Sequence, residues 1–245
     1  MIKTVWLDNP PVNAVNAGII DTLWRELDDD LGEDTRVVVL RGRGERAFSA
    51  GADIAGFQRA DGDGGRPAGI QPVADLIERT PVPVIAAIHG YCLGGGLEIA
   101  LACDLRVAHV DAQLGFPEVN LGLLPGGGGT QRAPRLIGRG RATWLIMSGE
   151  RIPARQAEAW GLVEFVVDDL EVGIEQVAGK LAGQSPHALR QIKELLHATR
   201  DERDDEREPR RATAHPDASC RAIARSRRTF FQSLERTEKT TSVTI

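Results

Sequence analysis

Aromatic residues, cysteines and long apolar runs are all scarce in this chain. Of 245 residues, 4% are aromatic and three are cysteines, at positions 92, 103 and 220. They form no CxxC pair, which argues against a disulfide scaffold or a zinc ribbon and predicts a reducing, cytoplasmic location. No segment approaches the roughly 18 apolar residues of a membrane-spanning helix, so no membrane partner is expected. Residues 1–8 predict a strand rather than a signal peptide.

An excess of positive charge is also missing. The 30 lysines and arginines are outnumbered by 35 acidic residues, giving a net charge of -5. This balance argues against a nucleic-acid partner, because such proteins carry a basic footprint. With 42% hydrophobic residues, a chain of this length has enough apolar material for one large core.

Strand-like and helix-like patterns alternate along the chain. Val37–Leu40 is typical of a strand buried on both faces, and Val82–Ile88 predicts another, with Pro83 near its beginning. Ser185 and Pro186 predict the start of a helix that runs to about Ala198. Further strands are predicted at 105–108, 113–116 and 163–167, and further helices at 19–27, 95–102, 141–147 and 154–160. This alternation predicts an α/β fold, although no repeat period is visible in the letters.

Two glutamates stand in unusually apolar surroundings. Glu98 lies within a glycine- and leucine-rich run, and on a helix its neighbours three and four residues on are Leu101 and Ala102. Glu118 lies in the run Gly-Phe-Pro-Glu-Val. Burying a carboxylate costs several kcal/mol unless a partner satisfies it. Two such carboxylates facing one cavity would form a general acid/base pair, whereas a solvated surface glutamate is the alternative at position 98.

Glycines and other small residues occur beside these glutamates. Glycines 94–96 precede a helical pattern, so their N–H groups could bind an oxyanion at the helix start; the alternative is tight helix–sheet packing. Residues 46–54 are mostly small and would let a ligand approach the backbone, or would form a turn with Asp53 as a helix N-cap.

Several other motifs do not meet their structural requirements. Four glycines at 126–129 suggest a phosphate cradle, but no Lys-Ser/Thr follows them. The GxGxxA pattern at 42–47 is followed by Gly51, which interrupts the helix that a dinucleotide fingerprint must open. There is no GxSxG elbow, and the five histidines show no metal-ligand spacing, so no metal site is expected. We expect His89 to be a loop residue rather than a catalyst.

Five segments of the chain strongly resemble one protein family. They are LDNPPVNAVN (7–16), FSAGADI (48–54), IAAIHGYCLGGGLEIALACDLRVA (85–108), LGFPEVNLGLLPGGGGTQRAPRLIG (114–138) and SGERIPARQAEAWGLVEFVV (148–167). In this order they resemble the enoyl-CoA hydratase/isomerase (crotonase) superfamily over roughly residues 2–196.

The resemblance implies a ββα spiral core with a helical C-terminal oligomerisation region. We expect the core, with the acyl-CoA site, at residues 1–185 and the helical region, with an atypical charged tail, at 186–245. The resemblance also implies a coenzyme A thioester as substrate and a homotrimer or a dimer of trimers as the assembly.

Residue roles follow from the same resemblance. The oxyanion hole is expected at the backbone N–H groups of Ala52 and Gly95, and the acid/base positions at Glu98 and Glu118. The remaining expected substrate-binding positions are Ala50, Asp53, Ile54, Gly94 and Gly126. Among these, Gly126 matches a position that helps to confine the water.

Both glutamates together favour hydration, the addition of water across the C2–C3 double bond of a 2-enoyl-CoA. No cofactor is expected, because coenzyme A is part of the substrate. Two alternatives stay open: an isomerase or another acyl-CoA enzyme of the same fold, and a non-catalytic binding or assembly member.

The end of the chain departs from the family pattern. Eleven of the twelve residues from Arg200 to Arg211 are charged, which is typical of a solvated helix or of disorder. No coenzyme A contact is assigned there. We expect the pocket wall to include the turn-rich segment 61–69 and the helix around Trp144.

Overall fold

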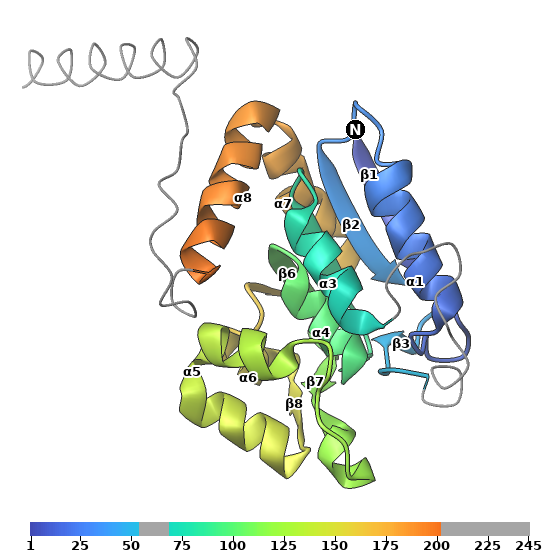
Figure 1. Ribbon diagram of the computed structural model, residues 1–245, viewed down its shortest axis with the longest axis vertical. Helices are drawn as coiled ribbons and strands as arrows, with labels where there is room; N and C mark the ends of the chain where they lie inside the picture. Colours follow the sequence, from blue (N-terminus) through green and yellow to red (C-terminus); the bar gives the residue numbers. More distant parts are fainter. Residues whose placement is uncertain (54–68, 202–245) are drawn as a thin grey trace, which may run out of the picture. The chain divides into compact units, whose positions relative to one another are not determined.

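A five-stranded parallel sheet is the frame of the molecule (Figure 1). The structure is a computed structural model that describes residues 1–53 and 69–201. The strands lie in the order β1-β2-β4-β6-β9 and span β1 Ile2–Leu7, β2 Val37–Gly42, β4 Val84–Ile88, β6 Leu105–His109 and β9 Phe165–Val167. All neighbours are parallel.

A second, shorter sheet has the order β3-β5-β7-β8. Its strands are three residues long: β3 Ala47–Ser49, β5 Tyr91–Leu93, β7 Gln113–Gly115 and β8 Arg151–Pro153. The first three are parallel, and β8 closes the sheet antiparallel to β7.

The two sheets are built by a repeated unit. Three times the chain passes through one strand of the large sheet and then one strand of the small sheet, as β2-β3, β4-β5 and β6-β7. A helix follows each pair: α3 (Ile70–Arg79), α4 (Gly95–Ala102) and the short 3-10 helix η3 (Pro117–Leu121). The expected α/β fold with a ββα spiral is therefore confirmed.

Helices cover both faces of the large sheet. Successive side chains of a strand point to opposite faces, so the apolar strands place residues to be covered on both sides. Val38 and Leu40 point into the core that contains α1 (Ala17–Trp24), α3 and α4. Val37 and Val39 point to the opposite face, where Ile174 and Ala178 of α7 (Leu170–Ala182) cover them. Helix α1 continues as the π-helix η1 (Arg25–Asp29).

The remaining helices are α5 (Gly129–Ser148), α6 (Ala154–Trp160) and α8 (Pro186–Asp201). Helix α5 is interrupted at Gly138, whose φ is 77°. None of the helices in the described ranges is long and apolar enough to cross a membrane.

A buried lysine fastens α8 to the body of the protein. Lys193 is 7% exposed, and its Nζ lies 2.7 Å from Asp104 Oδ2. The same ammonium donates to the carbonyl oxygens of Ile77 and Val82, each at 3.1 Å. Asp104 Oδ2 also accepts the N–H of Val84 at 2.7 Å, so this ion pair ties α8 to α3, β4 and the start of β6.

Most predicted elements are present, and several were missed. Helices 95–102 and 154–160 have the predicted bounds, whereas the pattern at 141–147 is only the second half of α5. Helices α3 and α7 and the strands β3, β5 and β8 were not predicted, whereas the predicted strands at 113–116 and 163–167 correspond to β7 and β9. The charged run from residue 202 and most of the 61–69 segment lie outside the described residues. The domain boundary at 185/186 stays a prediction.

Candidate functional site

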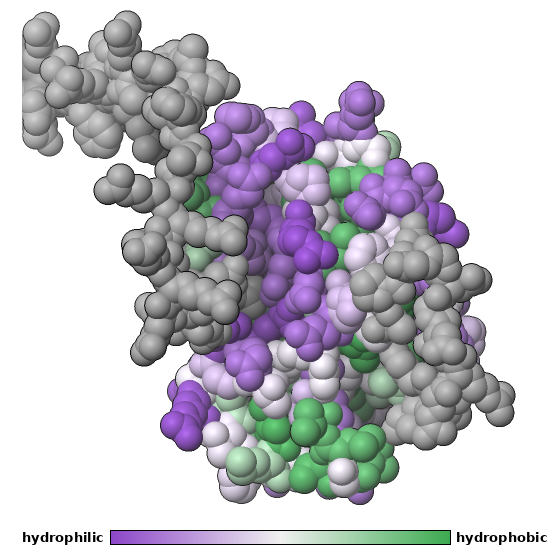
Figure 2. Space-filling model, in the orientation of Figure 1, coloured by the Kyte–Doolittle hydropathy of each residue, from purple (hydrophilic) through white to green (hydrophobic). Residues whose placement is uncertain are grey.

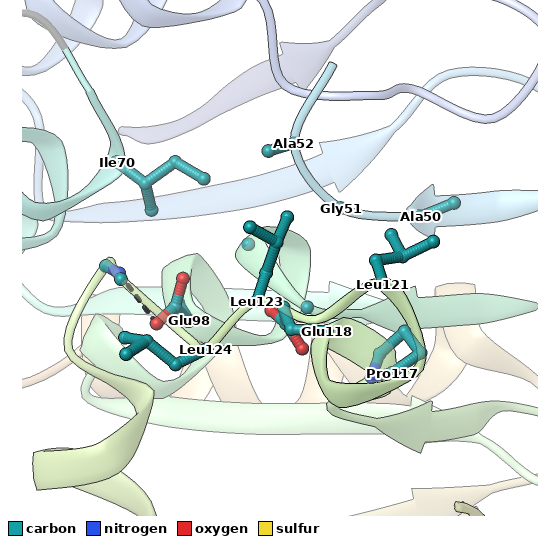
Figure 3. A pocket seen from close by; sticks show the side chains of 14 residues that line it. Ala50, Gly51, Ala52, Ile70, Glu98, Pro117, Glu118, Leu121, Leu123 and Leu124 are labelled. Atoms are coloured by element: carbon teal, nitrogen blue, oxygen red, sulfur yellow. Dashed lines mark hydrogen bonds between the residues drawn. The ribbon is translucent and has the colours of Figure 1, made fainter. Parts of the chain in front are cut away.

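A cavity of about 280 Å³ opens where the small sheet, α4 and η3 meet (Figure 3). In this view Glu98 and Glu118 lie along one wall, opposite Ile70 and Ala52. The lining residues are Ala50, Gly51, Ala52, Ile70, Gly94, Gly95, Glu98, Pro117, Glu118, Leu121, Leu123, Leu124, Gly126 and Gly127. Seven of the nine predicted site residues are among them.

Two backbone N–H groups at this cavity come from segments that the fold brings together. Gly95 is the first residue of α4, so its N–H has no partner inside the helix. A Cβ built on Gly95 would lie 3.3 Å from the nitrogen of Ala52. Val15 holds the Ala52 segment, donating to Gly51 O at 2.7 Å and accepting from Asp53 N at 2.9 Å. Neither Gly95 N nor Ala52 N donates to another described residue.

The turn before α4 depends on glycine. Gly94 has φ 50° and ψ -124°, a backbone conformation that residues other than glycine rarely adopt. A Cβ there would also lie 2.7 Å from Glu118 Oε1, and one on Gly95 would lie 2.2 Å from Ile70 Cδ1. The absent side chains therefore leave the helix start open and let the Glu118 carboxyl approach the backbone.

Glu98 lies inside α4, all of whose residues are buried, and is 2% exposed. Its Oε1 accepts the N–H groups of Gly127 at 2.7 Å and Gly129 at 2.8 Å. Burial raises the pKa of Glu98, while these two donors and the positive charge of Arg132 oppose the rise. The surface alternative is thus excluded, and the four-glycine run holds a carboxylate of the protein itself.

Glu118 lies in the first turn of η3, where its environment differs from that of Glu98. Burial raises the pKa of Glu118 to about 7; its own backbone N–H opposes the shift and the negative charge of Glu98 adds to it. Its Oε2 is buried without a hydrogen-bond partner in the described part of the chain. One carboxyl of the pair is therefore held as an acceptor, while the other keeps its proton up to near-neutral pH.

Of the predicted site residues that the structure describes, only Asp53 does not line the cavity. Asp53 lies directly after Ala52 and is half-buried, and Ile54 lies outside the described residues. Trp144, expected in the pocket wall, is 57% exposed and does not line the cavity, so this expectation is wrong. His89 does not line it either.

The apolar part of the wall was missed by sequence reasoning. It consists of Ile70 at the start of α3, Pro117 of η3 and three leucines at 121, 123 and 124. The leucines follow no helical or strand period, so only their position directly after Glu118 could have pointed to them. In Figure 2, apolar side chains gather on the surface where η3 and the segment after it lie in Figure 1.

Comparisons with known proteins agree with this architecture. The family model for enoyl-CoA hydratase/isomerase matches residues 1–235. A probable enoyl-CoA hydratase of Bacillus subtilis is 41% identical over 206 residues, covering 81% of this chain and 80% of its own. A short-chain-enoyl-CoA hydratase of Clostridium acetobutylicum is 40% identical, covering 80% and 77%.

A solved structure extends the similarity to three dimensions. The enoyl-CoA hydratase from Bacillus anthracis superposes with a TM-score of 0.74 at 42% identity, covering 80% of this chain and 78% of that one. The family model, the relatives and the shared fold lead to one conclusion: the chain belongs to the enoyl-CoA hydratase/isomerase family.

Proposed function

We propose that this protein adds water across the C2–C3 double bond of a 2-enoyl-CoA thioester to give a 3-hydroxyacyl-CoA. One observation carries the proposal: two carboxyl groups with different surroundings line the same cavity as two backbone N–H groups that donate to no other described residue. Hydration requires these parts, namely a base for the water, an acid for the neighbouring carbon and donors for the carbonyl oxygen.

The thioester carbonyl would accept hydrogen bonds from Ala52 N–H and Gly95 N–H. When water attacks C3, negative charge moves onto this oxygen in an enolate-like transition state. Donors that already point at the oxygen stabilise the charge without reorganising, and loss of one such donor typically costs about 10²–10³ in rate. The positive end of the α4 dipole, which lies at Gly95, adds to this stabilisation.

The two glutamates would divide the proton transfers. Glu98, held as a hydrogen-bond acceptor by Gly127 and Gly129, takes a proton from the water while the oxygen of the water bonds to C3. Glu118, whose pKa is about 7, gives a proton to C2. The reverse reaction exchanges these roles, and neither direction moves electrons to a carrier, so no metal or redox cofactor is required.

Paired substitutions test the proposal. Glu98→Gln and Glu118→Gln should each lower hydration of crotonyl-CoA by about 10²–10⁴, because each removes one proton transfer. The product is identified by mass as the substrate plus one water, which separates hydration from isomerisation. Glu175→Gln on the exposed side of α7 is the matched control and should hydrate at the wild-type rate.

Near-normal turnover by either cavity variant would remove that residue from the mechanism. Tight acyl-CoA binding by the wild-type chain, with no turnover of a panel of enoyl-CoA substrates, would favour a non-catalytic member of the family instead.

A homotrimer or dimer of trimers and a cytoplasmic location belong to the same proposal. Support for assembly comes from apolar side chains that are exposed in the described part of the chain, at Trp144 and Met147 of α5 and Ile192 and Leu195 of α8. Apolar surface of this kind favours association.

A further inference from the structure

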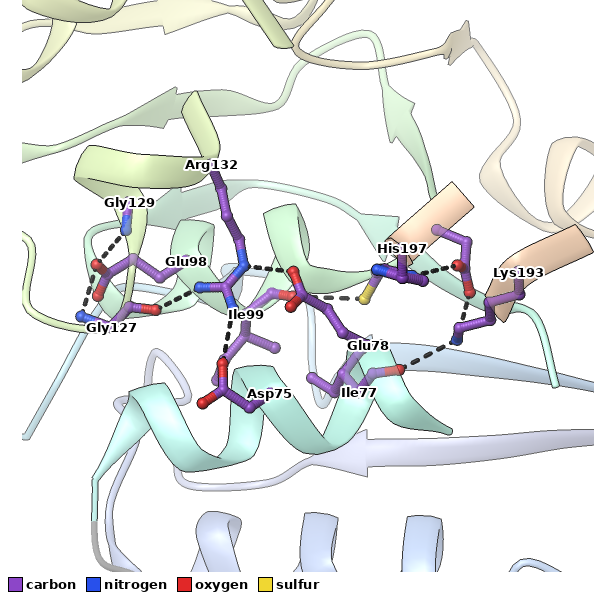
Figure 4. A network of polar contacts seen from close by, with 12 residues as sticks. Asp75, Ile77, Glu78, Glu98, Ile99, Gly127, Gly129, Arg132, Lys193 and His197 are labelled. Atoms are coloured by element: carbon purple, nitrogen blue, oxygen red, sulfur yellow. Dashed lines mark hydrogen bonds and ion pairs between the residues drawn. The ribbon is translucent and has the colours of Figure 1, made fainter. Parts of the chain in front are cut away.

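Arg132 is a buried arginine in the first turn of α5 that the proposed reaction does not use (Figure 4). It is 5% exposed, and its guanidinium donates in three directions. Nε lies 2.7 Å from Glu78 Oε1, Nη2 lies 3.1 Å from Asp75 Oδ1, and Nη1 lies 2.8 Å from the carbonyl oxygen of Gly127. Both carboxylates belong to α3, so Arg132 joins α3 to the glycine run.

The same glycine run holds Glu98. Gly127 donates its N–H to Glu98 Oε1 and accepts Arg132 Nη1–H at its carbonyl oxygen. Gly128, with φ 101°, leaves its side-chain space to the guanidinium, since a Cβ there would lie 1.9 Å from Arg132 Nη1. Arg132 N also donates to Gly128 O at 2.8 Å. The arginine therefore fixes the segment whose N–H groups orient the Glu98 carboxylate.

The positive charge of Arg132 also favours the ionised state of Glu98. Glu98 faces the cation of Arg132 from α5, which lowers the pKa of Glu98, and the carboxyl of Glu118 from η3, whose pKa the negative charge of Glu98 raises. Arg132 in turn faces Asp75 and Glu78, which are 42% and 19% exposed. Because these two acids are partly hydrated, they neutralise the buried guanidinium without being fully desolvated themselves.

We infer that Arg132 is a positioning residue for the reaction: it holds residues 127–129 so that Glu98 presents an ionised carboxylate in one orientation, and Asp75 and Glu78 hold Arg132. This inference rests on the proposed function, since it assigns Arg132 a role through Glu98. A misplacement of about 1 Å can cost on the order of 10² in rate, which sets the scale of the expected effect.

The test compares Arg132→Met, Arg132→Lys and Glu78→Gln in the full chain, using crotonyl-CoA. Arg132→Met should lower kcat on the order of 10²-fold with little change in KM, because substrate contacts remain. It should also move the acidic limb of the pH profile to higher pH, since a cation beside Glu98 is lost. Arg155→Met, which breaks an exposed pair on α6, is the control and should change neither quantity.

The other two variants separate charge from geometry. Arg132→Lys keeps the cation but cannot make all three contacts, so kcat should fall while the acidic limb stays near its wild-type position. Glu78→Gln keeps an acceptor for Nε–H and removes a negative charge; its kcat loss should be smaller than that of Arg132→Met. Its acidic limb should not follow that of Arg132→Met to higher pH.

A role in folding alone predicts a different pattern. In that case Arg132→Met would lose activity only in proportion to its unfolded fraction, with a wild-type pH profile, and this result would overturn the inference. If the wild-type chain hydrates no substrate, the proposed function fails separately. The inference is then decided by ¹³C NMR titration of Glu98, assigned with Glu98→Gln: an unchanged titration in Arg132→Met overturns it, and a shift to higher pH supports it.

Discussion

At the residue scale, the site depends on two identical side chains that differ in surroundings. The backbone N–H groups of Gly127 and Gly129 donate to the Glu98 carboxylate, whereas Glu118 has one buried oxygen without a partner in the described ranges. Near pH 7 the first is suited to accept a proton and the second to donate one. Because the two carboxyl groups are close together, ionisation of one disfavours ionisation of the other.

The raised pKa of Glu118 predicts a pH-dependent stability difference. Its folded-state pKa of about 7 lies above its ordinary value of 4.5. The contribution of this carboxyl to the free energy of unfolding is therefore fully present below pH 4.5 and is lost as pH rises through 7. Glu118→Gln removes this loss. Thermal unfolding should show equal stability near pH 4 and a variant more stable than wild type near pH 8, on the order of 1–2 kcal/mol after solvent screening of the half-buried side chain.

The control for this comparison is Glu175→Gln, whose difference from the wild type should not depend on pH across the same range. A Glu118→Gln curve that runs parallel to the wild type from pH 4 to pH 8 would contradict the assignment of a raised pKa to this carboxyl.

Sequence reasoning reached some of these residues and not others. Both glutamates could be singled out because their apolar neighbours made burial without a role expensive. The glycine run before a helix pointed to N–H donors near Gly95, but the pairing of Gly95 with Ala52 came only from the resemblance, because a backbone donor leaves no side-chain signature. Arg132 could not be recognised, since its partners on α3 are more than fifty residues away in the sequence.

At the element scale, length did not decide which elements could be predicted: α4 and α6 have the predicted bounds, whereas the longer helices α3 and α7 were missed. Helix α4 has the predicted bounds because it is apolar apart from Glu98 and starts at a glycine run. The strands of the small sheet have three residues each, too few for a clear period-2 pattern, and of these four strands only β7 was predicted. This is also the reason why the ββα repeat is invisible in the letters. Helix α3 begins after Gly69 and contains Pro72, so its start resembles a loop.

Helix α8 offers an element-scale prediction. Lys193→Met leaves Asp104, which β4 also holds through Val84 N–H, without its main cation. Breaking a buried ion pair by removing one partner typically costs about 3–5 kcal/mol. Urea unfolding should show a loss of this size, whereas Lys180→Met on the exposed side of α7 should change stability by less than about 0.5 kcal/mol. A small loss for Lys193→Met would mean that α8 is held by other contacts.

At the scale of the whole molecule, the exposed apolar residues predict assembly. Trp144 is 57% and Met147 is 72% exposed on α5, and such side chains are usually covered in an interface. Light scattering should give three or six times the chain mass of 26.5 kDa. Trp144→Glu should shift the mass downward at low protein concentration. A fully active wild-type protein with the mass of one chain would contradict this prediction.

Helix α4 supplies both Gly95, at its first residue, and Glu98, one turn later. Because the whole helix is buried, a shift of its axis displaces the proposed carbonyl-binding amide of Gly95 and the proposed water-activating acid Glu98 by the same vector. The spacing between the Gly95 N–H and the Glu98 carboxyl is therefore set by the geometry of one α-helical turn. Changes in acyl specificity can then occur at Ile70 and at the leucines of positions 121, 123 and 124, which line the cavity outside α4.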